Sequence, residues 1–430
     1  MTRLPDISRG LRFASTFLFL SAVLQAQATD STKQAEMIQQ LLQRIDQLEK
    51  RVTELEGVRP GQLAASAPAA PSVTMPMTPA ATTTTAAAGH DHGTTMEPAT
   101  SYPSLKLSGF GDINYSASDQ PGTHPGFNEG QFILHFSSAL SSRVAYFGEL
   151  SLTARTDAGT GSPPATGFNA EVERSIIRYD QSDHFKLSFG RYHTPISYWN
   201  TEFHHGSWLQ TTASRPEMIQ FGGNFIPVHF VGALAEGSFS AGGLNLNYNA
   251  GLGNGRSSVL SRSGDWGDVN NNKAWLANVF IKPDYLYGLQ LGASIYRDKI
   301  DVTGRPESRE WIESAHIVWA KERPEFIAEF FNVNHQQTIT GLVTNNQAWY
   351  AQVAYRLPME RWKPYYRYEY IHTPLADAIY SGLKLSVNGS NLGVRYDISS
   401  FAAFKFEWRN QNRPGLANIN LFWAQTSFTF

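Results

Sequence analysis

The feature that most restricts the fold is a two-residue alternation of apolar and polar side chains, which recurs between residues 105 and 430. In "AAFKFEWRN", residues 402–410, three aromatic side chains alternate with three charged ones. Comparable runs are "NLGVRYDIS", "KPYYRYEYI", "AWYAQVAYRL" and "AYFGELSLTAR", and turn-forming residues separate them. Because successive side chains of a strand point to opposite faces, the alternation predicts amphipathic β-strands.

Alternation alone is compatible with two architectures. In a soluble sandwich the apolar face would form the core, whereas in a membrane barrel it would contact lipid and the polar face would line a wet lumen. About sixteen such segments fit between residues 105 and 430, an even number, and many carry aromatic residues near their ends, as interfacial girdles do. These features favour an all-β fold: a transmembrane antiparallel β-barrel of about sixteen strands, formed by residues 103–430.

The N-terminal segment has the pattern of an export signal. Three arginines precede the apolar run "FASTFLFLSAVL", and Ala26-Gln27-Ala28 forms a small-x-small cleavage site. The run is too short to span a bilayer, so residues 1–28 are interpreted as a secretory signal peptide, with a short anchor helix as the alternative. No later run is long and apolar enough for a transmembrane helix, but an exported chain can enter a membrane as a closed barrel.

The last segment, "LFWAQTSFTF", places an aromatic residue, Phe430, at the end of the sequence. One face of this strand would carry Phe422, Ala424, Thr426, Phe428 and Phe430. Such an ending resembles the C-terminal signal that the barrel-insertion machinery recognises, and the strand must pair with "LKLSGFGDINYSAS" to leave no edge in lipid. We therefore expect the protein to lie in the outer membrane of a Gram-negative bacterium. Its expected partners are the lipid of that membrane and the barrel-insertion machinery.

Residues 29–57 show a heptad pattern that predicts an α-helical coiled coil. Its core positions are Ile38, Leu41, Ile45, Leu48, Val52 and Leu55. Arginines at g positions face glutamates at the following e positions, as in a parallel coil. β-branched residues at a and Leu at d favour dimers, but "RIDQLE" and "RVTELE" resemble a trimer motif, so we expect a homotrimer with this helix in the periplasm. A solvated single helix is the alternative.

Residues 58–102 are rich in Ala, Pro, Thr and Ser and have almost no large apolar residue. They predict a disordered linker. Two short stretches, "MPM" and "GHDHG", contain soft ligands that suit copper. Neither completes a ligand set, so low complexity is the favoured interpretation and no metal or other cofactor is expected.

Composition excludes several functional classes. Without the signal peptide the chain has 32 basic and 36 acidic side chains, a formal charge of −4, so nucleic acid is not an expected partner. There is no cysteine and hence no disulfide framework. Neither a G-x-S-x-G elbow nor an H-E-x-x-H stretch occurs, and a wide barrel suits a channel better than a side-facing catalytic site, so the chain is not expected to be an enzyme.

The stretch "FKLSFGRYHTP", in which Gly190-Arg191 precedes Pro195, is similar to a Gly-Arg-x-x-x-Pro stretch of one porin group. With the coiled coil and linker, the chain resembles the trimeric porins of the phosphate-selective porin O and P superfamily, including coiled-coil-bearing relatives. The resemblance implies a trimer of sixteen-stranded barrels, each with its own pore and an inward-folded loop. The candidate lumen-facing side chains are Arg155, Arg356, Arg367, Arg395, Lys405, Arg409, Glu149, Glu369, Asp397 and Glu407. Because their charges are mixed, phosphate specificity is not carried over.

Residues 198–223, "YWNTEFHHGSWLQTTASRPEMIQFGG", form an unusually long connection that mixes aromatic and ionisable side chains. Folded into the lumen, it would place a constriction there; an external loop at a trimer contact is the alternative. The candidate constriction residues are Glu202, His204, His205, Arg215 and Glu217. Adjacent histidines point to opposite faces in an extended chain, so His204 and His205 are not expected to bind a metal together.

These observations lead to a functional expectation. The chain would form a water-filled channel for passive diffusion of small hydrophilic solutes or ions, with anions among the candidates. The alternative is a structural or receptor barrel, tethered to the periplasm by its coiled coil and without transport.

Overall fold

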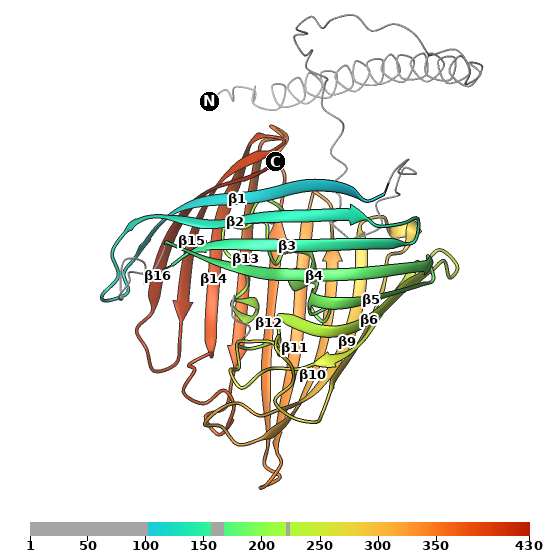
Figure 1. Ribbon diagram of the computed structural model, residues 1–430. Coiled ribbons are helices and arrows are strands. Elements are labelled where there is room, and N and C mark those ends of the chain that lie inside the picture. Colours follow the sequence, from blue (N-terminus) through green and yellow to red (C-terminus); the bar gives the residue numbers. More distant parts are fainter. Residues whose placement is uncertain (1–101, 156–166, 221–223) are drawn as a thin grey trace, which may run out of the picture. The chain divides into compact units, whose positions relative to one another are not determined.

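The computed structural model describes residues 102–155, 167–220 and 224–430. The predicted signal peptide and coiled coil, and all of the predicted linker except Tyr102, lie outside the described residues. Strands are the main regular structure of the described residues, which contain very little helix (Figure 1). None of the described helices is long and apolar enough to cross a membrane.

Sixteen antiparallel strands of the described residues close into a barrel in which each strand pairs with its neighbours in sequence (Figure 1). They are β1 Ser104–Ser118, β2 Gly126–Ala139, β3 Val144–Ala154, β4 Phe168–Ser182, β5 Phe185–His193, β6 His229–Phe239, β7 Leu246–Asn254, β8 Ala274–Ile281, β9 Leu289–Ile300, β10 Ser308–Trp319, β11 Glu325–Gln337, β12 Val343–Ala354, β13 Trp362–His372, β14 Val387–Ser399, β15 Ala402–Asn412 and β16 Ile419–Thr429. Three short helices interrupt the connections: α2 Tyr198–Phe203, η2 Glu217–Ile219 and η3 Asp284–Leu286. The predicted all-β antiparallel barrel and its strand number are confirmed for the described residues, whereas the coiled coil and the linker stay predictions.

The barrel closes between its first and last strands. Strand β1 pairs with β16 over the register Phe110↔Thr429 to Ser118↔Leu421. Beyond that ladder, Gly109 N donates to Phe430 O at 2.9 Å and Phe430 N donates to Gly109 O at 3.1 Å. The expected pairing of the two ends is thus confirmed, and no strand edge is left without a partner.

On β15 the exposed outer face of the sheet is apolar and the inner face is charged, which is the opposite of the arrangement in a soluble β protein. On β15, Phe406 is 42% exposed whereas Lys405 is 0% exposed, and the flanking aromatic and charged residues follow the same alternation. Exposed and buried positions alternate in the same way through β10 to β13. On β15 the charged side chains therefore point into the barrel and the aromatic ones point outward, whereas the inward face of β10 and β11 also carries apolar side chains such as Ile312 and Phe331. A sandwich with an apolar core, the alternative that the alternation left open, does not describe this chain.

The two ends of the barrel differ in the length of their connections. At one end the strands are joined by short turns of two to seven residues, such as 183–184 and 400–401. At the other end lie the longer connections 155–167, 194–228, 255–273 and 373–386. Buried apolar side chains of 194–228 and 373–386, including Trp199, Ile226 and Tyr380, belong to one cluster with inward residues of the wall. These two long connections therefore fill part of the barrel interior.

Candidate functional site

The site begins with the short helix α2, which follows β5 and leaves the wall. Ser197 caps the helix by accepting a hydrogen bond from Asn200 N at 3.1 Å. The carboxylate of Glu329, on β11, accepts from Tyr198 N at 2.7 Å and Trp199 N at 2.9 Å. A carboxylate at a helix N-terminus satisfies the free N–H groups and complements the helix dipole. Because β5 and β11 are not neighbours in the closed barrel, the helix crosses the interior to reach this partner.

Residues 207–217 continue along the inner wall of β13 to β15, where wall side chains hold the backbone. Arg367 donates to Ser214 O and to Arg215 O, both at 3.0 Å. Glu407 accepts from Ala213 N at 3.2 Å and from the Ser214 hydroxyl. Because backbone groups of an irregular segment need partners when buried, these charged wall residues make its docking possible.

The ten predicted lumen-facing residues are all at least half-buried, and several of them bind the backbone of residues 207–217. Seven are buried, namely Glu149, Arg367, Glu369, Arg395, Lys405, Glu407 and Arg409, and three are half-buried, namely Arg155, Arg356 and Asp397. Lys405 donates to Ser207 O and Thr212 O, and Arg395 donates to Trp208 O. The residues of β13 to β15 are therefore partners of residues 198–217, which are called the internal segment below.

The predicted constriction residues lie within this segment, but they are not free as the sequence interpretation supposed. Glu202, His204, His205 and Arg215 are buried, and Glu217 pairs with Arg409 at 3.0 Å. Arg215 donates to His204 O at 2.6 Å, and burial lowers the pKa of its guanidinium to about 9. The physical reason is that docking turns His204, Arg215 and Glu217 toward the wall or toward one another, whereas Glu202 lines the cavity described next. Residues 221–223 of the predicted segment lie outside the described part.

The open space lies on the other side of the segment. A cavity of about 350 Å³ is bounded by α2 and by inward residues of β4 to β10. Its charged lining comprises Arg174, Arg178, Lys186 and Lys282, with Glu202 and Glu236 as the acidic members. Burial raises the pKa of Glu202 to about 8 against the opposing effect of Lys282. The Glu202 carboxyl is therefore largely uncharged at neutral pH, and the cavity is predominantly basic.

The sequence analysis did not single out Arg174, Arg178, Lys186 or Lys282. Three of these lie on β4 and β5, and a β-bulge or irregularity in the β3–β4 pairing breaks the alternation beside Arg174. In "VERSIIRY" Arg174 and Arg178 share a face, but the adjacent Glu173 obscures the period of two. The sequence did not show which part of the barrel wall the internal segment covers, so it could not show which charged residues remain beside the cavity.

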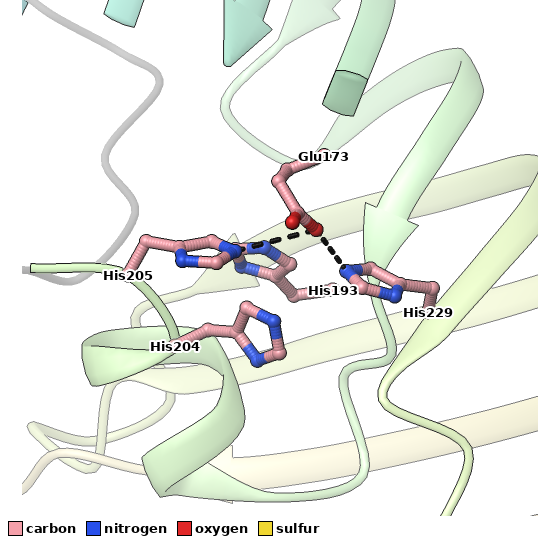
Figure 2. Close-up of side chains that lie close together, drawn as sticks. All are labelled: Glu173, His193, His204, His205 and His229. Carbon is pink, nitrogen blue, oxygen red and sulfur yellow. Dashed lines mark ion pairs between the residues drawn. The ribbon is translucent and has the colours of Figure 1, made fainter. Parts of the chain in front are cut away.

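Four histidines and a glutamate form a compact cluster beside this cavity (Figure 2). Glu173 comes from β4, His193 ends β5, His204 and His205 follow α2, and His229 begins β6. One ligand atom from each residue lies within 4.8 Å of one from every other. Burial, with His205 and His229 nearby, holds the pKa of His204 well below its usual range.

The expectation that His204 and His205 diverge assumed an extended chain. His204 instead has helical backbone angles at the C-terminal end of α2, φ −52° and ψ −49°. The chain turns there, and the two rings meet edge to face with centroids 4.4 Å apart. The other three members are distant in sequence, so no local spacing could have revealed them.

Comparisons with known proteins were made for both sequence and structure. No family model matches the chain, and no curated protein matches it. Among solved structures, the anion-selective porin from Comamonas acidovorans is similar with a TM-score of 0.56 at 12% identity, over 76% of this chain and 100% of that one. OmpF of Salmonella typhi, in complex with daunomycin, gives 0.55 at 12% identity, over 76% and 97%. The outer membrane channel DcaP of Acinetobacter baumannii gives 0.50 at 14% identity, over 77% and 99%. At these identities the comparison establishes the fold: this chain has the barrel fold of outer-membrane porins.

Proposed function

We propose that the chain is an outer-membrane porin, a channel for passive diffusion of small hydrophilic solutes. The observation that carries the proposal is the inverted polarity of a closed barrel, with apolar side chains outward and a charged cavity inside. An apolar outer face suits lipid, and a polar lumen suits hydrated solutes. The fold shared with solved porins supports the same function. No catalytic role is proposed.

We further propose that small anions are favoured over cations. Four basic side chains and two carboxyl groups line the cavity, and the raised pKa of Glu202 leaves one of those carboxyls mostly neutral. Charges facing a narrow aqueous passage with low-dielectric walls raise the local concentration of the opposite charge. Arg178 is partly offset by Asp180, at 2.7 Å, so Lys186 and Lys282 are the better candidates for selectivity. The candidate constriction residue Glu202 lines the cavity and would narrow the passage there.

The assembly and location are proposed from the sequence. The coiled coil of residues 29–57 would hold a homotrimer on the periplasmic side, and the barrels would associate through their walls. OmpT of Vibrio cholerae, another solved outer membrane protein of similar fold, has been described in a trimer form. The relationship to the phosphate-selective porin O and P superfamily rests on the Gly190-Arg191 stretch and is likewise a proposal.

Planar-bilayer recording of the purified full-length protein tests the function. We expect stable conductance steps and, in a salt gradient, a reversal potential that indicates anion preference. Replacing Lys186 and Lys282 together by Glu should shift the reversal potential toward cation preference. Lys384→Glu, at an exposed position in the 373–386 connection, is the matched control and should change nothing. A folded protein that never conducts would instead support the structural or receptor alternative.

A further inference from the structure

The histidine cluster has the composition of a transition-metal site and lies where the internal segment meets the wall. We propose that Glu173, His193, His204 and His205 bind one divalent ion of the zinc type, with His229 orienting the glutamate. Three imidazoles and one carboxylate are a common ligand set for four-coordinate zinc. Nitrogen-rich sites disfavour Mg²⁺ and Ca²⁺, which prefer oxygen ligands. The proposal does not depend on whether the barrel conducts.

The spacing of the cluster is close to what an ion would require. Ligand atoms around a tetrahedral zinc ion lie about 3.3–3.6 Å apart, given bonds of about 2.0–2.2 Å. In the structure His205 Nε2 lies 3.3 Å from Glu173 Oε2. The ring centroids of His193 and His204 are 4.1 Å apart, and those of His193 and His205 are 5.6 Å apart. Figure 2 shows Glu173 reaching toward His205 and His229, with the rings of His193 and His204 beside them. Small side-chain rotations would complete the ligand set.

The outer hydrogen bonds select the nitrogen that faces the cluster. His204 Nδ1 lies 2.7 Å from Asn200 Oδ1, and His205 Nδ1 lies 3.3 Å from Gln131 Oε1. An amide oxygen only accepts, so both rings donate through Nδ1–H, and Nε2 is the unprotonated nitrogen of each neutral ring. Metal-binding histidines are usually fixed by a partner of this kind on their second nitrogen.

His229 has a different arrangement, and this is why it is assigned a supporting role. Its Nδ1 lies 3.2 Å from Arg191 Nη2, and a guanidinium can only donate. The proton of the neutral ring must therefore be on Nε2, which lies 2.8 Å from Glu173 Oε2. His229 thus holds the glutamate in position while its own lone pair is used by Arg191.

Two arginines near Glu173 have other carboxylate partners, while Arg191 also lies 3.9 Å from Glu173 Oε2 and the buried Arg215 lies close to His204. Arg174 pairs with Glu149 at 2.5 Å, and Arg191 pairs with Glu171 at 2.9 Å. Access is provided by the cavity of about 350 Å³, because His193 is part of its lining. A bound ion would join β4, β5 and the end of α2, and so would fix the internal segment at the end opposite to its Arg367 anchor.

The test uses untagged full-length protein, freed of metal with a chelator and titrated with Zn²⁺ against a chromophoric competitor. We expect one tight Zn²⁺ site per chain, no comparable binding of Mg²⁺, and the intense visible absorption of four-coordinate Co²⁺ when that ion is substituted. Replacing His193 and His205 together by Gln should weaken Zn²⁺ binding by more than about 100-fold. His229→Gln and Gln131→Leu, which alter supporting contacts, should weaken it by about 10–100-fold.

Two controls separate this site from other histidines. His316→Gln removes a buried histidine that lies outside the cluster and hydrogen-bonds to Gln290, and it should leave Zn²⁺ binding unchanged. Replacing His90 and His92 of the linker by Ala tests the "GHDHG" stretch and should also have no effect. Should the double Gln variant fail to give a heat-modifiable barrel on gels, His204→Gln replaces it. Unchanged binding in a folded cluster variant, loss of binding in the linker variant, or a six-coordinate Co²⁺ spectrum would overturn the assignment.

Discussion

Replacing Arg367 by Met should release the internal segment while leaving the barrel closed. The Arg367 guanidinium donates to four acceptors on the segment: Thr212 Oγ1, Ser214 O, Ser214 Oγ and Arg215 O, at 2.8–3.0 Å. It also pairs with Glu369 at 2.8 Å and is fully buried. Met keeps most of the volume and removes every one of these bonds. The strand ladders do not use this side chain, so they should persist.

The size of the effect follows from the charged hydrogen bonds that join the Arg367 guanidinium to the segment. A hydrogen bond to a charged group contributes about 1.5–3 kcal/mol. The loss of even one such bond from the docked state lowers the docked-to-released ratio by about 10- to 150-fold. Single-channel recording should show larger and noisier conductance steps. Limited proteolysis should cut within residues 207–215, while heat-modifiable migration on gels reports an intact barrel.

Two further variants make this result interpretable. Arg323→Met removes an exposed arginine whose backbone contacts lie in the short turns, and surface pairs of this kind contribute at most about 1 kcal/mol. It should behave as the wild type. Replacing Ser214 by Ala removes part of the contact from the segment side and should give a weaker effect in the same direction. If Arg367→Met leaves noise and proteolysis unchanged in a folded barrel, the wall arginine does not hold the segment.

Three other predictions concern the faces, the pH dependence and the assembly. Phe406→Arg should impair membrane insertion, at a cost of about 2–4 kcal/mol if the site lies near mid-bilayer. Lys405→Ala should insert normally. Equal tolerance of the two variants in an insertion assay would mean that the faces are reversed. Since the raised pKa of Glu202 is about 8, its carboxyl gains charge as the pH rises from about 7 to about 9, so anion preference measured by reversal potential should fall over that range and Glu202→Gln should abolish the change. A peptide of residues 35–56 should sediment at three times its monomer mass, and a clean dimer would contradict the trimer motif.

The strands could be predicted from sequence because their signal is local. The alternating runs at 145–155, 363–371, 391–399 and 402–410 coincide with β3, β13, β14 and β15. The run at 348–357 overshoots the end of β12 by three residues, since residues 355–361 turn back to the next strand. Period-two alternation is fixed by the backbone geometry of a strand, so each run predicts its own structure without knowledge of its neighbours.

The site could not be predicted in the same way because its contacts are far apart in sequence. Glu329 meets the N-terminus of α2 across 131 positions, and Arg367 meets Ser214 across 153. The histidine cluster combines four separate segments, and only the adjacent pair was visible as "HH". Even that pair was misjudged, since the interpretation assumed extended chain where a helix ends.

The position of the internal segment changes how the charges of this barrel should be counted. The strands β13 to β15 carry the most conspicuous inward charges, and their mixed signs were the reason that phosphate specificity was not carried over from the resemblance. Most of those charges are bound to the segment, as Arg395 and Lys405 illustrate, and a charge hydrogen-bonded to a docked backbone does not face the solute. The side chains that remain beside open space lie on β4 to β10, and among them Lys186 and Lys282 outnumber the ionised carboxyls. Ion selectivity is therefore expected to depend on the charged side chains of the part of the wall that the internal segment does not cover.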